Sequence, residues 1–292
     1  KKMKAEQTIL HYVEKHSSKA GTPTMGGIIF ILAAIIACAF FLWSGSFYGW
    51  LAILVMVAFG LLGFLDDFIK VHFHQNEGLK PYQKIIGQAA IALIIAFLIY
   101  YKVGSNLDFF GLSIDIGWGI IPFAVIVFLA VVNSVNLTDG LDGLAGGVSL
   151  VYLLFFGAIV ALIGAPEMDM LALASFAVCG GLIAFLAVNT FPAKIFMGDT
   201  GSLALGGFIA CLALFSGKAL LIPIMGIMFV LSALSDIIQV AYYKKTKKRV
   251  FLMAPLHHHF EKKGVHENRI VTIYIIVTSL LSAVCLCLEI AL

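Results

Sequence analysis

Apolar runs long enough to cross a membrane recur along the whole chain. A hydrocarbon core of about 30 Å takes around 20 residues of α-helix. Reading the runs between their polar breaks predicts nine spans, at 26–43, 47–65, 85–101, 119–135, 146–164, 170–190, 202–216, 219–243 and 270–291. The composition agrees, because 61% of the residues are hydrophobic and only 12% are charged. Transmembrane barrels show short segments of alternating polarity instead, so we predict an all-α, polytopic transmembrane helical bundle formed by a single domain, residues 1–292.

The lysines and arginines fall almost entirely on one side of this predicted bundle. Five lie in 1–19, three in 66–84, one in 191–201 and eight in 244–269. Only Lys102 and Lys218 lie on the other side. Because the cytoplasmic loops of membrane proteins are enriched in these residues, the basic side is predicted to face the cytoplasm. On the other side, segment 104–118 alternates apolar and polar residues around a glycine, which predicts a short external hairpin.

Residues with reactive or ligating side chains gather on the basic side. Its connections contain DDFIK at 66–70, GLKPYQK at 78–84, NLTDGLDG at 136–143, NTFPAKIFMGDTGS at 189–202 and APLHHHFEKKG at 254–264. The opposite connections, SGSFYG, GAPEMD and SGK, are typical of surface turns. This asymmetry predicts one active surface that faces the cytoplasm, on which several loops converge.

The stretch Asn133 to Gly147, NSVNLTDGLDGLAGG, places Asp139 and Asp142 at a membrane boundary between two apolar runs. Ionisable groups at that depth are costly and usually functional. Its four glycines also allow close approach of the backbone to a ligand. A tight interfacial turn explains the stretch equally well.

Two further segments offer carboxylates to a cation. Asp66 and Asp67 end one span, and Lys70 follows at the spacing of a helical turn. Adjacent carboxylates bind divalent cations or leave one group free as a base, although a solvated helix end with an intrahelical ion pair is the simpler explanation of this motif alone. Asp199, in FMGDTGS, is placed to present a carboxylate to Mg²⁺ and backbone N–H groups to a phosphate. The alternative is an ordinary helix N-cap.

Three consecutive histidines, His257, His258 and His259, cannot all face one metal from a regular helix, and the spacing of a zinc site is absent. Imidazoles donate hydrogen bonds to anionic oxygens, and the neighbouring Pro255 and Phe260 favour a defined local shape over a solvated loop.

Carboxylates, lysines, histidines and glycine turns together suit phosphoryl transfer, in which Mg²⁺ and cationic side chains neutralise charge. A lipid phosphate is the natural substrate for such a site in a membrane.

Five motifs resemble one enzyme family across almost the whole chain. They are KAGTPTMGG at 19–27, LDDFIK at 65–70, NLTDGLDGLAGG at 136–147, NTFPAKIFMGDTGS at 189–202 and APLHHHFE at 254–261. They closely resemble the phospho-N-acetylmuramoyl-pentapeptide transferases of bacteria, a branch of the polyprenyl-phosphate N-acetylhexosamine-1-phosphate transferase superfamily. The acidic motifs are shared by the superfamily, whereas GTPTMGG and PLHHHFE are specific to the branch. The resemblance implies a homodimer of ten-helix chains with both termini outside, so a tenth helix is expected before Lys1.

The resemblance also implies the reaction. Phospho-MurNAc-pentapeptide passes from UDP-MurNAc-pentapeptide to undecaprenyl phosphate, which forms lipid I and releases UMP with Mg²⁺ as cofactor. This is the first membrane step of peptidoglycan synthesis, on which cell wall biogenesis, cell shape and cell division depend. The implied location is the bacterial cytoplasmic membrane, with membrane lipid and the two substrates as partners and no nucleic acid.

The resemblance implies the roles of individual residues as well. Asp199 is expected to bind Mg²⁺, with Asp66 and Asp67 beside the metal and the lipid phosphate, and Asp66 as the candidate base. Direct attack and a covalent aspartyl intermediate both remain open. Lys70, Lys84 and His258 are expected to hold phosphate oxygens, supported by His257 and His259. Phe196 is expected to stack on uracil, in a pocket lined by Lys19, Thr24, Asn136, Asp139, Asp142, Asn189 and Gln239.

Three other functions fit parts of the pattern. A sister enzyme that uses UDP-N-acetylglucosamine would share the acidic motifs, but the histidine segment argues against it. A transporter would carry its polar residues to the bilayer midplane, in both halves of a repeat, whereas here they cluster on one side and no internal repeat is visible. An intramembrane aspartyl protease would need two carboxylates but not the lysines and histidines.

Overall fold

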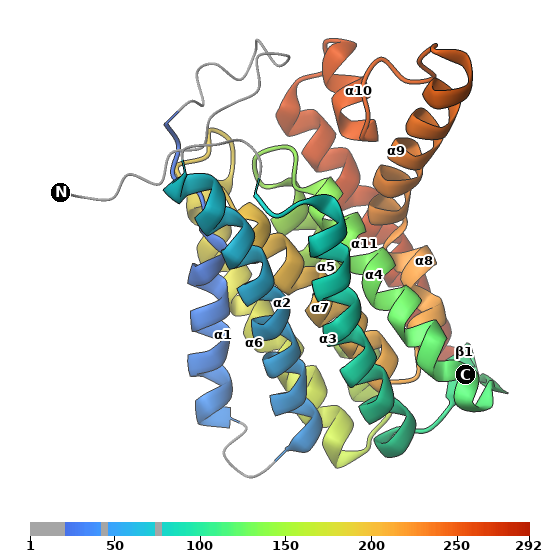
Figure 1. Cartoon of the computed structure of the whole chain (residues 1–292). Helices are drawn as coiled ribbons and strands as arrows, with labels where there is room; N and C mark the ends of the chain where they lie inside the picture. Colours follow the sequence, from blue (N-terminus) through green and yellow to red (C-terminus); the bar gives the residue numbers. More distant parts are fainter. Residues whose placement is uncertain (1–20, 42–45, 74–77) are drawn as a thin grey trace.

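The computed structural model describes residues 21–41, 46–73 and 78–292, and nearly all of its elements are helices (Figure 1). The helices are α1 Gly27–Phe41, α2 Phe47–His72, α3 Pro81–Lys102, α4 Ile120–Thr138, α5 Leu144–Leu162, α6 Pro166–Asn189, α7 Gly198–Phe215, α8 Ile222–Met225, α9 Ile227–Thr246, α10 Leu256–Lys262 and α11 Glu267–Ala291. Within the described ranges, eight helices are long and apolar enough to cross a membrane, and α1 is a shorter apolar helix. The predicted all-α, polytopic membrane bundle is confirmed.

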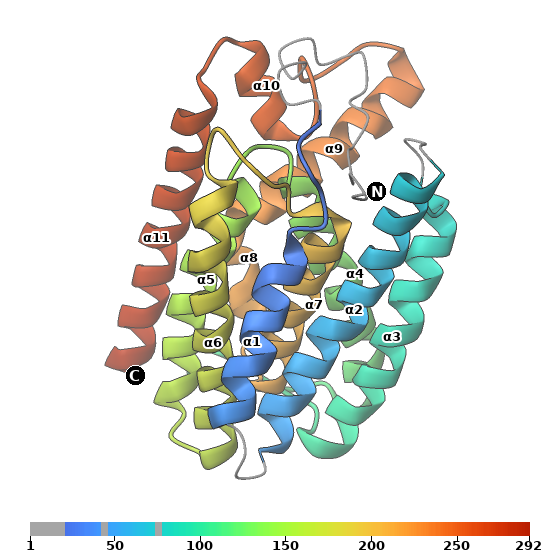
Figure 2. The same cartoon turned by 90° about the vertical axis from the view of Figure 1, so that its left-hand side faces the viewer.

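Helix α7 lies in the middle of the bundle in both views (Figures 1 and 2). Every residue from Thr200 to Phe215 is buried, and α1, α2, α4 and α5 all pack against α7. Its sequence, GDTGSLALGGFIACLALF, is rich in glycine and alanine. Small residues let membrane helices approach closely, because tight packing replaces the hydrophobic effect inside a bilayer. The acidic turn at the start of α7 is thereby fixed at one end of the bundle core.

The span predicted at 219–243 begins too early, because the chain breaks inside it and the membrane helix is Ile227–Thr246. A 3₁₀ turn, Ala219–Leu221, leads into α8, and α9 begins only after Gly226. The N–H of Gly226 closes α8 by donating to the carbonyl of Ile222 at 2.8 Å. Pro223, in the first turn of α8, lacks an N–H and favours a helix start. The run stays apolar throughout, so hydropathy alone hides the break.

Two other boundaries differ from the prediction. Helix α2 continues past residue 65 to His72, so the DDFIK motif lies on a helix and not after it. The histidine segment, expected as part of a connection, forms the short helix α10. In Figures 1 and 2, α10 and the last turns of α9 rise above the end of the bundle at which α2 ends and α7 begins.

The hairpin predicted at 104–118 is confirmed at the other end of the molecule. Strand β1, Asn106–Phe109, pairs antiparallel with β2, Leu112–Asp115, and Figure 1 shows it far from α10. Lys218, which is 8% exposed, joins the hairpin to the last helix by contacting the carboxylates of Asp108 and Glu289. These ion pairs hold the pKa of Lys218 above its usual value.

Candidate active site

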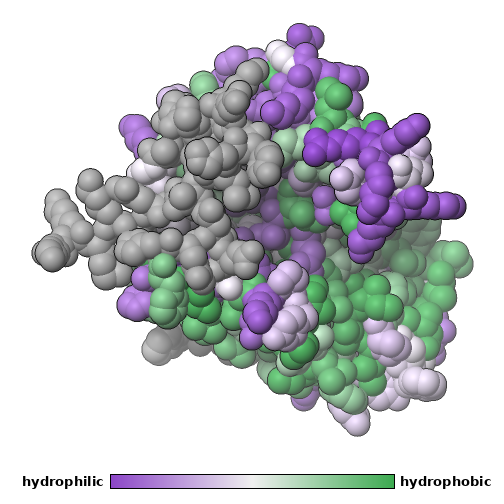
Figure 3. Space-filling model, turned by 45° about the horizontal axis from the view of Figure 1, so that its top comes forward, coloured by the Kyte–Doolittle hydropathy of each residue, from purple (hydrophilic) through white to green (hydrophobic). Residues whose placement is uncertain are grey.

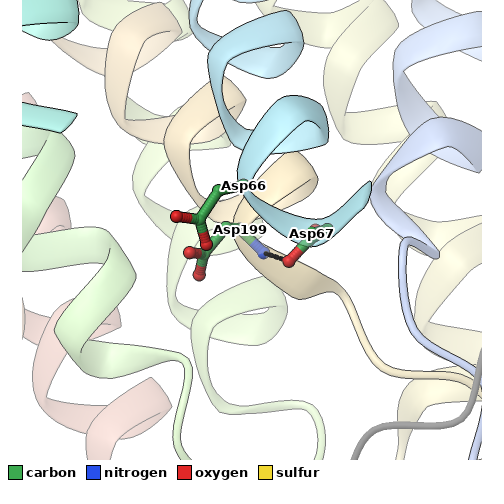
Figure 4. A group of neighbouring side chains, drawn as sticks. All are labelled: Asp66, Asp67 and Asp199. Carbon is green, nitrogen blue, oxygen red and sulfur yellow. Dashed lines mark hydrogen bonds between the residues drawn. The ribbon is translucent and has the colours of Figure 1, made fainter. Parts of the chain in front are cut away.

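Three carboxylates meet between the end of α2 and the first turn of α7 (Figure 4). One oxygen from each of Asp66, Asp67 and Asp199 lies within 4.8 Å of the others. Asp66 is 1% exposed and Asp67 is 3% exposed. A glycine makes the approach possible, because a Cβ at Gly63 would lie 2.1 Å from the carbonyl oxygen of Asp199. The glycine one turn before the aspartates therefore sets how closely α2 and α7 approach.

Asp67 caps the start of α7. Its Oδ2 accepts hydrogen bonds from the Thr200 N–H at 2.9 Å and the Thr200 hydroxyl at 2.7 Å. Its Oδ1 accepts from the backbone N–H of Asp199 at 3.2 Å, the dashed line in Figure 4. These N–H groups lack partners within the helix, and the helix dipole favours a negative charge there. Asp67 thus fixes the backbone that carries Asp199.

Asp66 and Asp199 share two lysines. The Lys70 ammonium lies 2.6 Å from Asp66 Oδ2 and 3.0 Å from Asp199 Oδ2. The Lys84 ammonium, from the first turn of α3, lies 2.6 Å from Asp199 Oδ2 and 3.5 Å from Asp66 Oδ1. Asp66 Oδ1 also accepts from the Leu79 N–H at 2.9 Å. Two positive charges thus face three carboxylates at the end of a membrane bundle.

Asn136, near the end of α4, lies against this acidic cluster. Its amide nitrogen donates to Asp199 Oδ1 at 2.8 Å and to the Ser202 hydroxyl at 2.9 Å. Asn136 was expected to line a nucleoside pocket, and in the structure its amide orients Asp199.

The two polar loops beside the cluster are joined through side chains that were expected to bind the donor. Asp142, 5% exposed, accepts from the Ala193 N–H at 2.9 Å. Asn189, 3% exposed, accepts from the Gly143 N–H at 3.1 Å and donates to the Ile195 carbonyl at 2.9 Å. Both side chains therefore hold backbone, and they fix the 139–143 turn against the 189–196 loop.

Asp139 follows the last residue of α4 and is half-buried. Loss of hydration raises its pKa to about 8, and the negative charges of Asp199, Asp67 and Asp142 act in the same direction.

The segment before α1 pairs with the loop that leads into α7. The Phe196 N–H donates to the Pro23 carbonyl at 2.8 Å, and the Gly26 N–H donates to the Phe196 carbonyl at 2.8 Å. Thr24 is 8% exposed, and the Phe196 ring is half-buried. Lys19 lies outside the described residues. The first motif is thus brought to the same end of the bundle as the acidic cluster.

The three histidines of α10 have different surroundings. His257 is 0% exposed and packs on the 139–143 turn, where a Cβ at Gly140 would lie 2.2 Å from its Nε2. His258 Nδ1 lies 3.0 Å from a carboxylate oxygen of Glu261. His259 Nδ1 accepts from a backbone N–H seven residues before it. Of these contacts, the one made by His257 joins the segment to the 139–143 turn.

Gln239 shapes the chain between α9 and α10. Its side-chain oxygen accepts from the N–H groups of Val250 and Phe251, both at 3.0 Å, and its amide donates to the Phe251 carbonyl at 3.1 Å. Gln239 was expected in the nucleoside pocket, and in the structure its contacts hold the backbone of this segment. Viewed toward this end, hydrophilic side chains lie in a recess in the middle of the molecule (Figure 3).

We expect His257 to make stability depend on pH. Burial lowers its pKa to about 3, and the nearby His258 adds to the effect. An unfolded chain binds a proton at this histidine below about pH 6.5, whereas the folded protein stays neutral there down to about pH 3. The free energy of unfolding is therefore unaffected by this histidine above about pH 6.5. It falls by about 2 kcal/mol between that pH and about pH 5.

The measurement is the apparent Tm in detergent between pH 8 and pH 5. His257→Asn should lower Tm at pH 8 but show a shallower decline toward pH 5 than the unsubstituted protein. Equal slopes for the two proteins would show that His257 takes up no proton on unfolding.

Some residues that build the site were not predicted from the sequence. Thr200, Ser202, Leu79 and Glu267 all contact residues of the polar motifs. Thr200 and Ser202 stand within the FMGDTGS motif, which was the visible signal for them. The contacts of Leu79 and Glu267 depend on how loops fold back, and no local pattern marks them.

Comparison with known proteins identifies a family for this chain. A family model described as glycosyl transferase family 4 matches residues 49–217. The phospho-N-acetylmuramoyl-pentapeptide-transferase signature 1 matches residues 19–31.

Curated relatives cover nearly the whole chain. The phospho-N-acetylmuramoyl-pentapeptide-transferase of Thermoanaerobacter sp. (strain X514) is 46% identical over 271 residues, which are 91% of this chain and 83% of that protein. The enzyme of the same name from Clostridioides difficile (strain 630) is 44% identical over 274 residues, 92% of this chain and 84% of its own. The resemblance seen in the five motifs is confirmed. The chain belongs to the phospho-N-acetylmuramoyl-pentapeptide-transferase family.

Proposed function

We propose that this protein transfers phospho-MurNAc-pentapeptide from UDP-MurNAc-pentapeptide to undecaprenyl phosphate, forming lipid I and releasing UMP. The observation that carries the proposal is the group of Asp66, Asp67 and Asp199 with Lys70 and Lys84 at one end of a membrane bundle. The names of the curated relatives supply the substrate class. A site at the bundle end lets a lipid phosphate arrive from the bilayer and a nucleotide donor arrive from water.

The reaction joins two anionic substrates. An oxygen of the lipid phosphate attacks the donor phosphorus that carries the sugar, a new P–O bond forms, and the P–O bond to UMP breaks. Negative charge on both phosphates opposes this approach, so cationic groups must hold them. Lys70 and Lys84 are the ammonium groups nearest the carboxylate cluster in the described chain, and we assign them to phosphate oxygens.

The residues present fit Mg²⁺. Three carboxylates with oxygens within 4.8 Å offer the hard oxygen ligands that this ion prefers. Asp199 is the ligand we assign, with Asp66 beside it, because the oxygens of Asp67 already accept hydrogen bonds from the start of α7. When bound, Mg²⁺ would neutralise charge on the diphosphate.

Asp66 is our candidate for removing a proton from the lipid phosphate. A phosphate monoester with a second pKa near 6 is mostly dianionic at neutral pH, so direct attack needs little help from a base. The alternative of a covalent aspartyl intermediate would require a carboxylate oxygen to attack first.

The donor is assigned to the polar loops around the cluster. Phe196 is proposed to stack on uracil, with Asp139 as a hydrogen-bond partner and Thr24 close by. Asp142, Asn189 and Gln239 shape the surrounding backbone. His258 is assigned to phosphate oxygens, with His257 and His259 in support.

The topology and assembly are also part of the proposal. The basic connections support a site on the cytoplasmic side of the bacterial membrane, and family resemblance supports a homodimer of single-domain chains. These features agree with a soluble cytoplasmic donor and a lipid acceptor.

A comparison of two donor substrates tests the donor specificity. Purified protein in detergent is given undecaprenyl phosphate, Mg²⁺ and either UDP-MurNAc-pentapeptide or UDP-N-acetylglucosamine, and UMP release is followed. We expect release with the muramoyl donor alone, and only when the lipid is present. Comparable release with UDP-N-acetylglucosamine would favour the sister activity instead.

A further inference from the structure

A buried carboxylate outside the acidic cluster connects the last helix to the site. Glu267 stands in the first turn of α11 and is 8% exposed. Its Oε1 accepts a hydrogen bond from the backbone N–H of Asp142 at 2.6 Å, although 125 residues separate the two in sequence. Nothing in the reaction proposed above uses this carboxylate. Burying such a group is costly unless strong hydrogen bonds compensate, so a role in fixing the turn accounts for its placement.

The N–H groups that hold the turn are consecutive. Glu267 accepts from the N–H of Asp142, and Asn189 accepts from the N–H of Gly143. The Asp142 side chain then accepts from the N–H of Ala193 in the neighbouring loop. A continuous set of contacts thus runs from the start of α11 through the 139–143 turn to the 189–196 loop.

Both connected segments lead directly to groups of the proposed site. The turn follows α4, whose Asn136 orients Asp199, and it carries the glycine against which His257 packs. The loop ends at Phe196, two residues before α7 begins. Displacement of the turn would therefore move the donor side of the site. The backbone of Asp199 and Thr200 is held in addition by Asp67, through contacts that do not involve the turn.

We propose that Glu267 is a positioning residue for the nucleotide donor. By accepting the Asp142 N–H, it sets the conformation of the 139–143 turn and, through the Asp142 carboxylate, of the 189–196 loop. Donor affinity depends on this contact, whereas binding of the lipid phosphate does not. The inference rests on the proposed function in one respect, namely that these two segments line the donor pocket.

Steady-state kinetics of the full-length purified protein test the proposal. UDP-MurNAc-pentapeptide is varied at saturating undecaprenyl phosphate, and then the lipid is varied at saturating donor. Glu267→Ala should raise the KM for the donor about 10-fold or more, the loss expected for a buried charge-assisted hydrogen bond. The KM for the lipid should stay unchanged. Glu267→Gln should restore a donor KM close to that of the unsubstituted protein, because an amide oxygen also accepts a hydrogen bond.

The other end of α11 supplies the matched control. Glu289 forms an ion pair with Lys218 at 2.6 Å, at the end of the molecule away from the site. Glu289→Ala should lower the apparent Tm and leave both KM values unchanged. A purely structural role for Glu267 would make Glu267→Ala behave in the same way.

The outcomes separate the inference from the proposed function. No UMP release by the unsubstituted protein would contradict the function itself. Normal release together with an unchanged donor KM in Glu267→Ala, or an equal rise in both KM values, would overturn only the role of Glu267. If Glu267→Ala cannot be purified folded, Glu267→Asp replaces it. The aspartate side chain is one methylene shorter, so its carboxylate lies farther from the Asp142 N–H and the donor KM should rise. An unchanged donor KM would overturn the role of Glu267.

Discussion

Asp199→Asn is expected to lower the rate of UMP release by about 10³-fold or more while the protein remains folded in detergent. The substitution keeps the size of the side chain and an oxygen that can accept from Asn136. It removes the negative charge that lies 3.0 Å from Lys70 and 2.6 Å from Lys84. Both lysines would lose a partner that fixes their direction, and the proposed metal site would lose its assigned ligand.

A second aspartate provides the control for this substitution. Asp108 pairs with Lys218 in the hairpin at the opposite end of the molecule. Asp108→Asn should change the apparent Tm but leave the rate of UMP release within about a factor of 2. Near-normal UMP release by Asp199→Asn would refute its assignment as the metal ligand.

Removal of divalent cations is expected to stop transfer completely. Three carboxylates face two lysines in the cluster, and a bound diphosphate would add further negative charge that the lysines alone cannot neutralise. Protein treated with EDTA and then desalted should release no UMP, and added Mg²⁺ should restore the rate.

A binding measurement makes this prediction independent of turnover. Mg²⁺ that binds only the folded protein raises the apparent Tm by mass action. We expect that rise in the unsubstituted protein and its absence in Asp199→Asn. Full activity after chelation, or an equal rise in both proteins, would contradict a metal site at Asp199.

The fold was largely predictable because its main determinant is local. A run of about 20 apolar residues has few stable structures other than a membrane helix, and alternation of the connections then assigns the loops to two sides. The failures also have local causes. The break at Gly226 lies inside an unbroken apolar run, and the charged residues of DDFIK hid the last turns of α2.

The composition of the site was predictable, but the separate tasks of its residues were not. The motifs were predicted to converge because they lie in connections on the same predicted side of the membrane. Asp67 was grouped with Asp66 and Asp199, yet its oxygens hold Thr200, which lies 133 residues further along the chain. Such pairings are set by how α2 packs on α7, and only a glycine such as Gly63 hints at that contact. The same holds for Glu267, which no motif contained.

The most direct test of the central claim follows the fate of one phosphorus atom. UDP-MurNAc-pentapeptide labelled in the phosphate next to the sugar is incubated with the purified protein, undecaprenyl phosphate and Mg²⁺. The account predicts that all transferred label appears in the lipid product and that the nucleotide released is unlabelled UMP. Release of labelled UDP, with the lipid gaining sugar but no label, would show that the protein transfers a glycosyl group and would contradict the account.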